Sequence, residues 1–152
     1  ATQNVDGLHL VAGNSPDLVH EVHGTWQYTR CIGCGDRLPV EDTLQRVDAG
    51  EADPKCLKCG GLMKRDVILF GEALIPGVIS AAITAAEEAD LILAIGTQLN
   101  VTPAANVVTR GKAAGAKVVI MNNQPTDRDR YANAFLMGDI TEMLPALVAI
   151  PD

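Results

Sequence analysis

The sequence has few aromatic residues, no apolar run of membrane-spanning length and no excess of basic charge. Trp, Tyr and Phe make up only 3% of the chain, so its 47% hydrophobic content is mostly aliphatic, as in α/β proteins with buried parallel strands. The missing apolar run argues against a transmembrane protein. The net charge of -7 argues against nucleic acid as the main ligand, because phosphate binding needs a basic face. We therefore expect neither a nucleic-acid nor a membrane partner.

A secretory signal peptide is also missing from the first residues, which favours a reducing, cytoplasmic location. All four cysteines belong to two C-x-x-C pairs, Cys31 with Cys34 and Cys56 with Cys59. Two such pairs are typical of a structural zinc site with four thiolate ligands. Two disulfides are the alternative, which a reducing compartment disfavours. A closed shell of four sulfurs leaves no position for substrate, so we expect this zinc to be structural.

Residues 63–152 alternate short apolar runs with longer segments of helical periodicity. The runs predict strands at 67–70, 91–95, 118–121 and 135–137. The segments between them predict helices at 78–89, 103–114 and after Asp139, with Pro103 as a first helical residue and Asp139 as an N-cap. This alternation predicts parallel βα units of a doubly wound, Rossmann-like sheet. We expect residues 1–30 and 63–152 to form one partial domain, with 31–62 as a zinc-ribbon insertion.

Small or polar residues follow each predicted strand, where ligands of open parallel sheets bind. These tips are Gly71-Glu72, Gly96-Thr97-Gln98, Asn122-Asn123 and Gly138-Asp139. Together they predict a crevice suited to a nucleotide. No G-x-G-x-x-G loop occurs, so either the pyrophosphate cradle lies outside this chain or the ligand has no pyrophosphate.

The N-terminal segment concentrates polar side chains. Gln3, Asn4 and Asp6 lie within four positions, and such groups are costly to bury unless a polar ligand pairs with them. His23 precedes Gly24 and is a candidate general base, since histidine exchanges protons near neutral pH. A purely structural role for this histidine is the alternative.

Several of these motifs together resemble the sirtuin family of NAD-dependent protein-lysine deacylases. They are TQNVDGLH, the following AG, EVHG, the two C-x-x-C pairs, DVILFGE, the GT after a strand, N-x-x-PT and the final GD. The resemblance covers essentially the whole chain. It implies NAD and zinc as cofactors and an acyl-lysine protein or peptide as substrate.

The resemblance also implies a role for each matching residue. His23 matches the catalytic base, which deprotonates a ribose hydroxyl, and Gln3, Asn4 and Asp6 match residues around nicotinamide and its ribose. Val5 and Phe70 match apolar walls of the acyl-lysine tunnel. Gly71, Glu72 and the stretch near Val101 match edges between which a substrate peptide adds as a strand. The adenosine end is matched by Gly96, Thr97, Asn122, Asp139 and Ile140, with Gln98 where the family has Ser.

The resemblance begins at Thr2, and the family's glycine-rich NAD loop precedes that point. We therefore expect only the later half of the family's sheet, little activity from this polypeptide alone and association through an exposed sheet edge. A non-catalytic zinc-bearing interaction module with sirtuin sequence is the alternative. Half of a dehydrogenase is disfavoured, because it explains neither His23-Gly24 nor the paired cysteines.

Overall fold

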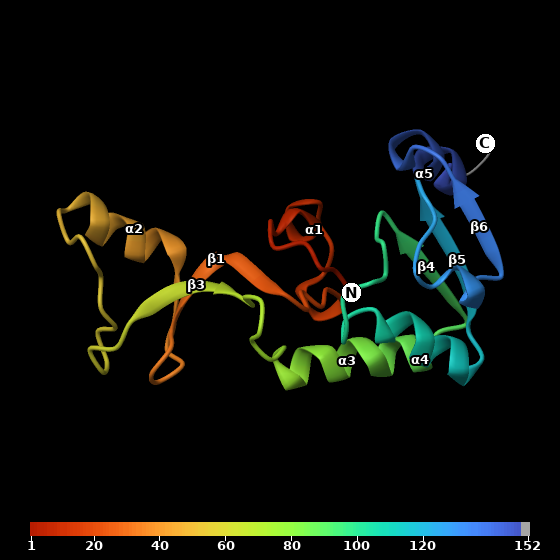
Figure 1. Cartoon of the computed structure of the whole chain (residues 1–152). Helices are drawn as coiled ribbons and strands as arrows, with labels where there is room; N and C mark the ends of the chain where they lie inside the picture. Colours follow the sequence, from red (N-terminus) through yellow and green to blue (C-terminus); the bar gives the residue numbers. More distant parts are fainter. Residues whose placement is uncertain (150–152) are drawn as a thin grey trace. The chain divides into compact units, whose positions relative to one another are not determined.

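The computed structural model describes residues 1–149, and its contacts divide the chain into two compact units, Ala1–Val78 and Ile79–Asp152. Figure 1 shows both units and labels most of their helices and strands. Helix α3, Pro76–Glu87, crosses the boundary between them.

The first unit is built on an antiparallel sheet in the order β2-β1-β3. Its strands are β1 (Gly24–Cys31), β2 (Arg37–Pro39) and β3 (Met63–Val67). The helical segments of this unit are α1 (Leu8–Val11), the 3-10 turn η1 (Pro16–Leu18) and α2 (Val40–Asp48). The Thr-Trp-Gln-Tyr-Thr run of β1 has the β-branched and aromatic residues that favour strands. Thr43 of α2 shares a 2.7 Å hydrogen bond with Thr29 of β1, which holds the helix on the sheet.

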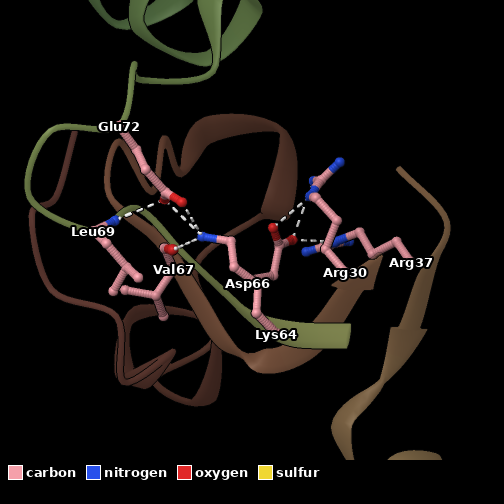
Figure 2. Close-up of polar contacts among 7 residues, drawn as sticks. All are labelled: Arg30, Arg37, Lys64, Asp66, Val67, Leu69 and Glu72. Atoms are coloured by element: carbon pink, nitrogen blue, oxygen red, sulfur yellow. Dashed lines mark hydrogen bonds and ion pairs between the residues drawn. The ribbon is translucent and has the colours of Figure 1, made fainter. Parts of the chain in front are cut away.

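A buried carboxylate ties the three antiparallel strands together (Figure 2). Asp66 of β3 is 4% exposed, and its oxygens accept bonds from Arg30 Nε of β1 at 2.6 Å and Arg37 Nε of β2 at 2.5 Å. Burial raises the pKa of Asp66, but the hydrogen bonds from Arg30 and Arg37 lower it by more, so the pKa lies below its usual value. Arg37 also stacks over the Tyr28 ring, with its guanidinium carbon 3.6 Å from the ring centroid.

The second unit contains a parallel sheet in the order β4-β5-β6. Its elements are β4 (Leu91–Ile95), α4 (Asn106–Ala114), β5 (Lys117–Asn122), η2 (Asp129–Tyr131), β6 (Ala134–Met137) and α5 (Ile140–Val148). The core joins Ala94, Val118 and Ile120 of the sheet to Leu99, Ala105 and Val108. These buried aliphatic strands confirm the predicted α/β fold with a parallel sheet.

Helix α4 approaches its neighbours closely at Gly111. A Cβ there would lie 2.3 Å from Ile92 Cδ1 and 2.5 Å from the Ala86 carbonyl oxygen. Gly111 is therefore a packing position between helices and sheet. Gly115, with φ of 114°, ends α4, so neither glycine belongs to a phosphate loop.

Two local predictions are wrong. The apolar run 67–70 is not a strand of the parallel sheet: β3 ends at Val67 and pairs antiparallel with β1. The helix expected from Pro103 begins at Asn106, because residues 101–105 form turns that include a bond from Ala105 N–H to the Val101 carbonyl. Asp139 is confirmed as the N-cap of α5, accepting a 2.8 Å bond from the Thr141 N–H.

Every helix within residues 1–149 is too short or too polar to cross a lipid bilayer.

Replacing Asp66 by Asn should lower the free energy of unfolding by about 1–3 kcal/mol at pH 7. The amide cannot neutralise two guanidinium groups, but the Arg30 and Arg37 side chains are 35% and 41% exposed, so water screens part of the loss. A carboxylate with a depressed pKa stabilises the fold only while ionised. The difference between wild type and variant should therefore be complete above about pH 4 and vanish as the pH falls through the folded-state pKa of Asp66.

Urea unfolding from pH 7 to pH 3 measures this difference. Asp53→Asn is the matched control, because Asp53 pairs with Lys55 through a carboxylate that is 69% exposed. A stability difference for Asp66→Asn that stayed constant over this range would show that its charge is not what stabilises the sheet.

Candidate functional site

The four cysteines converge on one point at the end of the antiparallel sheet. Cys31 ends β1, and their four sulfur atoms all lie within 4.8 Å of one another. Cys31 Sγ is 3.5 Å from Cys59 Sγ, and Cys34 Sγ is 3.6 Å from Cys56 Sγ. A disulfide bond is about 2.05 Å long, whereas four sulfurs about 2.3 Å from a tetrahedral zinc ion lie about 3.8 Å apart. The geometry fits zinc and not disulfides.

Glycines shape the backbone around these sulfurs. Gly35 and Gly60 each follow the second cysteine of a pair with positive φ, 76° and 71°, and each donates a backbone bond to the first cysteine's carbonyl. Such φ values favour glycine, so the effective signature is C-x-x-C-G rather than C-x-x-C. Gly61 has a different role, because a Cβ there would lie 3.0 Å from Cys31 Sγ and 3.2 Å from Cys59 Sγ.

The electrostatics of the cluster call for a cation. The Cys34 backbone N–H contributes most to lowering the pKa of Cys31 to about 6, which favours the metal-binding thiolate. The Gly61 backbone lowers the pKa of Cys59, but the sulfurs of Cys34 and Cys31 outweigh it and raise that pKa to about 12. Four thiolates this close need a bound cation to ionise together, and Zn²⁺ supplies that charge. Cys31, Cys34, Cys56 and Cys59 would be its ligands.

The polar N-terminal segment lies alongside the chain around His23. Thr2 donates to the His20 carbonyl at 2.9 Å and accepts from Val22 N–H at 3.0 Å. Val5 accepts a 2.9 Å bond from Trp26 N–H, and the Asp6 carboxylate accepts a 3.0 Å bond from Leu8 N–H. These bonds run residues 2–6 alongside residues 20–26. The segment next to His23 therefore includes Gln3, Asn4, Val5 and Asp6.

His23 is held at the junction of β1 and β3. Its carbonyl accepts a 2.9 Å bond from Ile68 N–H, which fixes its backbone to the end of β3. Gly24 follows with φ of 79°, and a Cβ there would lie 2.1 Å from the Asp66 carbonyl oxygen. Only glycine fits this close approach, so the sheet requires glycine directly after the histidine. His23 as a whole residue is half-buried.

Phe70, Gly71 and Glu72 lie in the turn after β3. Phe70 is fully exposed, and the Glu72 carboxylate bonds Lys64 and the Leu69 N–H. The prediction that Gly71 and Glu72 form one tip of the parallel sheet is therefore wrong, because this turn belongs to the antiparallel sheet of the first unit.

The other three predicted tips meet around one cavity of about 400 Å³ in the second unit. Its lining residues are Gly96 after β4, Asn122 and Asn123 at the end of β5, and Gly138, Asp139 and Ile140 after β6. Ligand cavities commonly have this size, and this one lies at the carboxyl edge of the parallel strands. Asn123 and Gly138 also line it, as the strand tips predicted, although the family resemblance assigns them no individual role.

Hydrogen bonds fix the polar groups of this cavity. Buried Asn122 donates its side-chain amide to the Gln124 carbonyl at 2.8 Å. The Asp139 carboxylate accepts bonds from the hydroxyl and backbone N–H of Thr141, and both lower its pKa, so it is ionised at neutral pH. A Cβ on Gly96 would lie 3.3 Å from Ile140 Cδ1, so a larger residue at position 96 would crowd Ile140 in the cavity lining.

Three predicted site residues lie near this cavity in sequence but outside its lining. Thr97 accepts a 3.2 Å bond from Leu99 N–H, and the Gln98 carbonyl accepts a 3.1 Å bond from Asp127 N–H. Leu99 has φ of 54°, a costly conformation for a non-glycine residue, while its side chain is buried in the core. Val101 follows on an exposed turn.

Comparison with known proteins gives one consistent family. The sequence profile of the Sir2 family matches residues 1–103. NAD-dependent protein deacetylase 2 of Streptomyces coelicolor is 44% identical over 147 residues, which are 97% of this chain and 61% of that protein. For NAD-dependent protein deacetylase 1 of Pyrobaculum aerophilum, the identity is 40% over 147 residues, which are 97% of this chain and 56% of that protein.

A solved structure described as Sir2 bound to acetylated peptide is similar, with a TM-score of 0.86 and 30% identity over 95% of this chain and 60% of that one. The chain thus spans 61% and 56% of the length of the two relatives above.

We expect one zinc ion per chain, and Gly61→Ala should weaken its binding about tenfold or more. The added methyl would contact Cys31 and Cys59 and push the sulfurs apart. Metal analysis measures the number of zinc ions per chain, and competition with a chromogenic chelator measures the zinc affinity. Cys31→Ser, which removes a ligand, gives the lowest zinc affinity expected in the series.

Gly77→Ala is the matched control, because a Cβ there meets no atom within 4 Å. Zinc affinity that was equal in Gly61→Ala and Gly77→Ala would contradict the steric argument. Absence of zinc in the wild-type protein would contradict the metal site itself.

Proposed function

The chain belongs to the Sir2 family, and from that membership we propose that it is part of an NAD-dependent protein-lysine deacylase. The single observation that carries this proposal is the placement of His23 beside the polar segment of Gln3, Asn4 and Asp6. We assign residues 1–30 and 63–152 to the partial NAD-binding domain and residues 31–62 to a structural zinc insertion.

His23 is proposed as the catalytic base, whose imidazole accepts a proton from a ribose hydroxyl. When bound, NAD supplies the sugar carbon to which the acyl oxygen is transferred as nicotinamide leaves. Gln3, Asn4 and Asp6 are proposed to bind nicotinamide and its ribose. One base and neutral or acidic polar groups suit this reaction, because the departing group needs no strong acid.

The cavity of the second unit is proposed to hold adenosine. Asp139 is an ionised acceptor for ribose hydroxyls, and Gly96, Asn122 and Ile140 provide open, polar and apolar contacts. Thr97 and Gln98 are proposed to contact the cofactor from the turn after β4. The size of the cavity, about 400 Å³, supports a nucleoside.

The substrate is proposed to be an acyl-lysine peptide or protein. Val5 and Phe70 would contact the apolar part of the acyl-lysine, and Gly71, Glu72 and Val101 would contact the peptide backbone. The four cysteines are arranged as metal ligands and form no disulfide, which supports a reducing location, and we propose the cytoplasm.

This polypeptide alone should bind NAD weakly, with a dissociation constant above about 100 µM. The glycine-rich phosphate loop of the family is not among its residues, so the pyrophosphate would lack backbone N–H donors. Titration calorimetry with NAD tests this, with the complete enzyme as positive control. Micromolar binding by residues 1–152 would show that the phosphates are held elsewhere.

In the complete enzyme, His23→Ala should lower the rate of deacylation about 10²–10⁴-fold. Zinc content and thermal unfolding should not change, because the backbone carbonyl of His23 rather than its imidazole bonds the end of β3. An acetyl-lysine peptide, NAD and detection of nicotinamide provide the assay. His9→Ala is the control, since His9 lies exposed on α1.

Deacylation that survived His23→Ala would place the base elsewhere. Peptide binding without turnover by the wild-type enzyme would instead favour a non-catalytic interaction module.

A further inference from the structure

The turn after β3 is closed by two side chains together with one backbone hydrogen bond; Figure 2 shows the side-chain contacts. Lys64 Nζ donates to the Val67 carbonyl at 2.8 Å and to the two Glu72 carboxylate oxygens at 2.8 and 2.6 Å. One of those oxygens accepts a 2.8 Å bond from the Leu69 N–H. The Glu72 N–H donates to the Leu69 carbonyl at 3.0 Å and completes the loop.

These bonds occupy the side of the run 67–70 that faces away from β1. The Ile68 N–H bonds the His23 carbonyl on the β1 side, so the Val67 carbonyl lies on the opposite side. Lys64 bonds that carbonyl, and Glu72 bonds the Leu69 N–H. The Leu69 N–H contributes most to lowering the pKa of Glu72, followed by Lys64, so the carboxylate is ionised at neutral pH. The Lys64 and Glu72 side chains are 27% and 38% exposed, so their attraction is partly screened and adds little to overall stability.

The closed turn presents Phe70 and Gly71 to solvent. Phe70 is 105% exposed relative to an extended reference, so its ring has no cover from the protein. Within residues 1–149, no hydrogen bond uses the backbone groups of Phe70 or Gly71. An apolar ring beside free backbone groups, on a turn fixed at both ends, is suited to an extended peptide with an apolar side chain.

We propose that Lys64 and Glu72 are positioning residues for the acyl-lysine peptide. They hold the turn so that Phe70 and Gly71 are in place before the peptide arrives, which lowers the entropy lost on binding. This inference rests on the proposed function, because it takes the peptide of that reaction as the ligand. Neither side chain needs to touch the peptide for this effect.

The test compares Glu72→Gln, Lys64→Met and Lys64→Arg with wild type in the complete enzyme. Glu72→Gln and Lys64→Met should each raise KM for an acetyl-lysine peptide about tenfold, which corresponds to loss of a charge-assisted bond. The kcat and KM for NAD should stay within about twofold, because the turn would affect only peptide binding. Lys64→Arg keeps the positive charge and should retain most of the wild-type affinity for the peptide.

Glu87→Gln is the matched control, because Glu87 also pairs with a basic residue, Arg110, at 2.8 Å and lies in the second unit. It should leave KM for the peptide unchanged. An unchanged peptide KM in Glu72→Gln, or an equal loss of kcat and of NAD affinity, would overturn the inference.

Direct binding separates this inference from the proposed function. Fluorescence anisotropy with a labelled acetyl-lysine peptide needs no turnover. If wild type binds the peptide without turnover, the proposed reaction fails, while about tenfold weaker binding by Glu72→Gln still supports positioning. If wild type binds no peptide, both proposals fail.

Discussion

The buried carboxylate of Asp66 is the constraint on which the first unit depends. Its two oxygens hold arginines from the other two strands, β1 and β2, so the three strands are joined by side chains as well as by their backbone pairing. The backbone carbonyl of the same residue lies where a side chain on Gly24 would be. The position of His23 therefore depends on how closely β1 and β3 approach at Gly24, where the glycine leaves room for the Asp66 backbone.

Strand β1 connects the chemical features of this unit. It begins at Gly24, directly after the candidate base, and ends at Cys31, a zinc ligand. A zinc ion bound there would act structurally, because it would close the end of β1 opposite His23. In the second unit, the parallel strands position the lining of the cavity, because they bring three separate turns to one edge of the sheet.

The sequence predicted the parallel sheet well, because strands such as Leu91–Ile95 are short, apolar and followed by glycine or asparagine. It missed β1, because the mixture of Thr, Trp, Gln and Tyr on both faces of that strand hides the usual apolar–polar alternation. It also missed α2, although Val40, Leu44 and Val47 have the helical spacing that could have revealed it. The zinc ligands followed from spacing alone. The cavity at the carboxyl ends of the parallel strands followed from the strand tips. Lys64 was missed, because no local pattern reveals that a lysine will bond a glutamate eight positions on.

The turn after β3 also bears on self-association. The segment Val67–Phe70 is uncharged and rich in residues that favour cross-β stacking, the kind of sequence that attracts other chains when its backbone is free. With the carbonyl of Val67 and the N–H of Leu69 already bonded, a second copy finds no continuous row of groups on which to build a sheet. The bonded groups therefore oppose growth of a fibril from this edge.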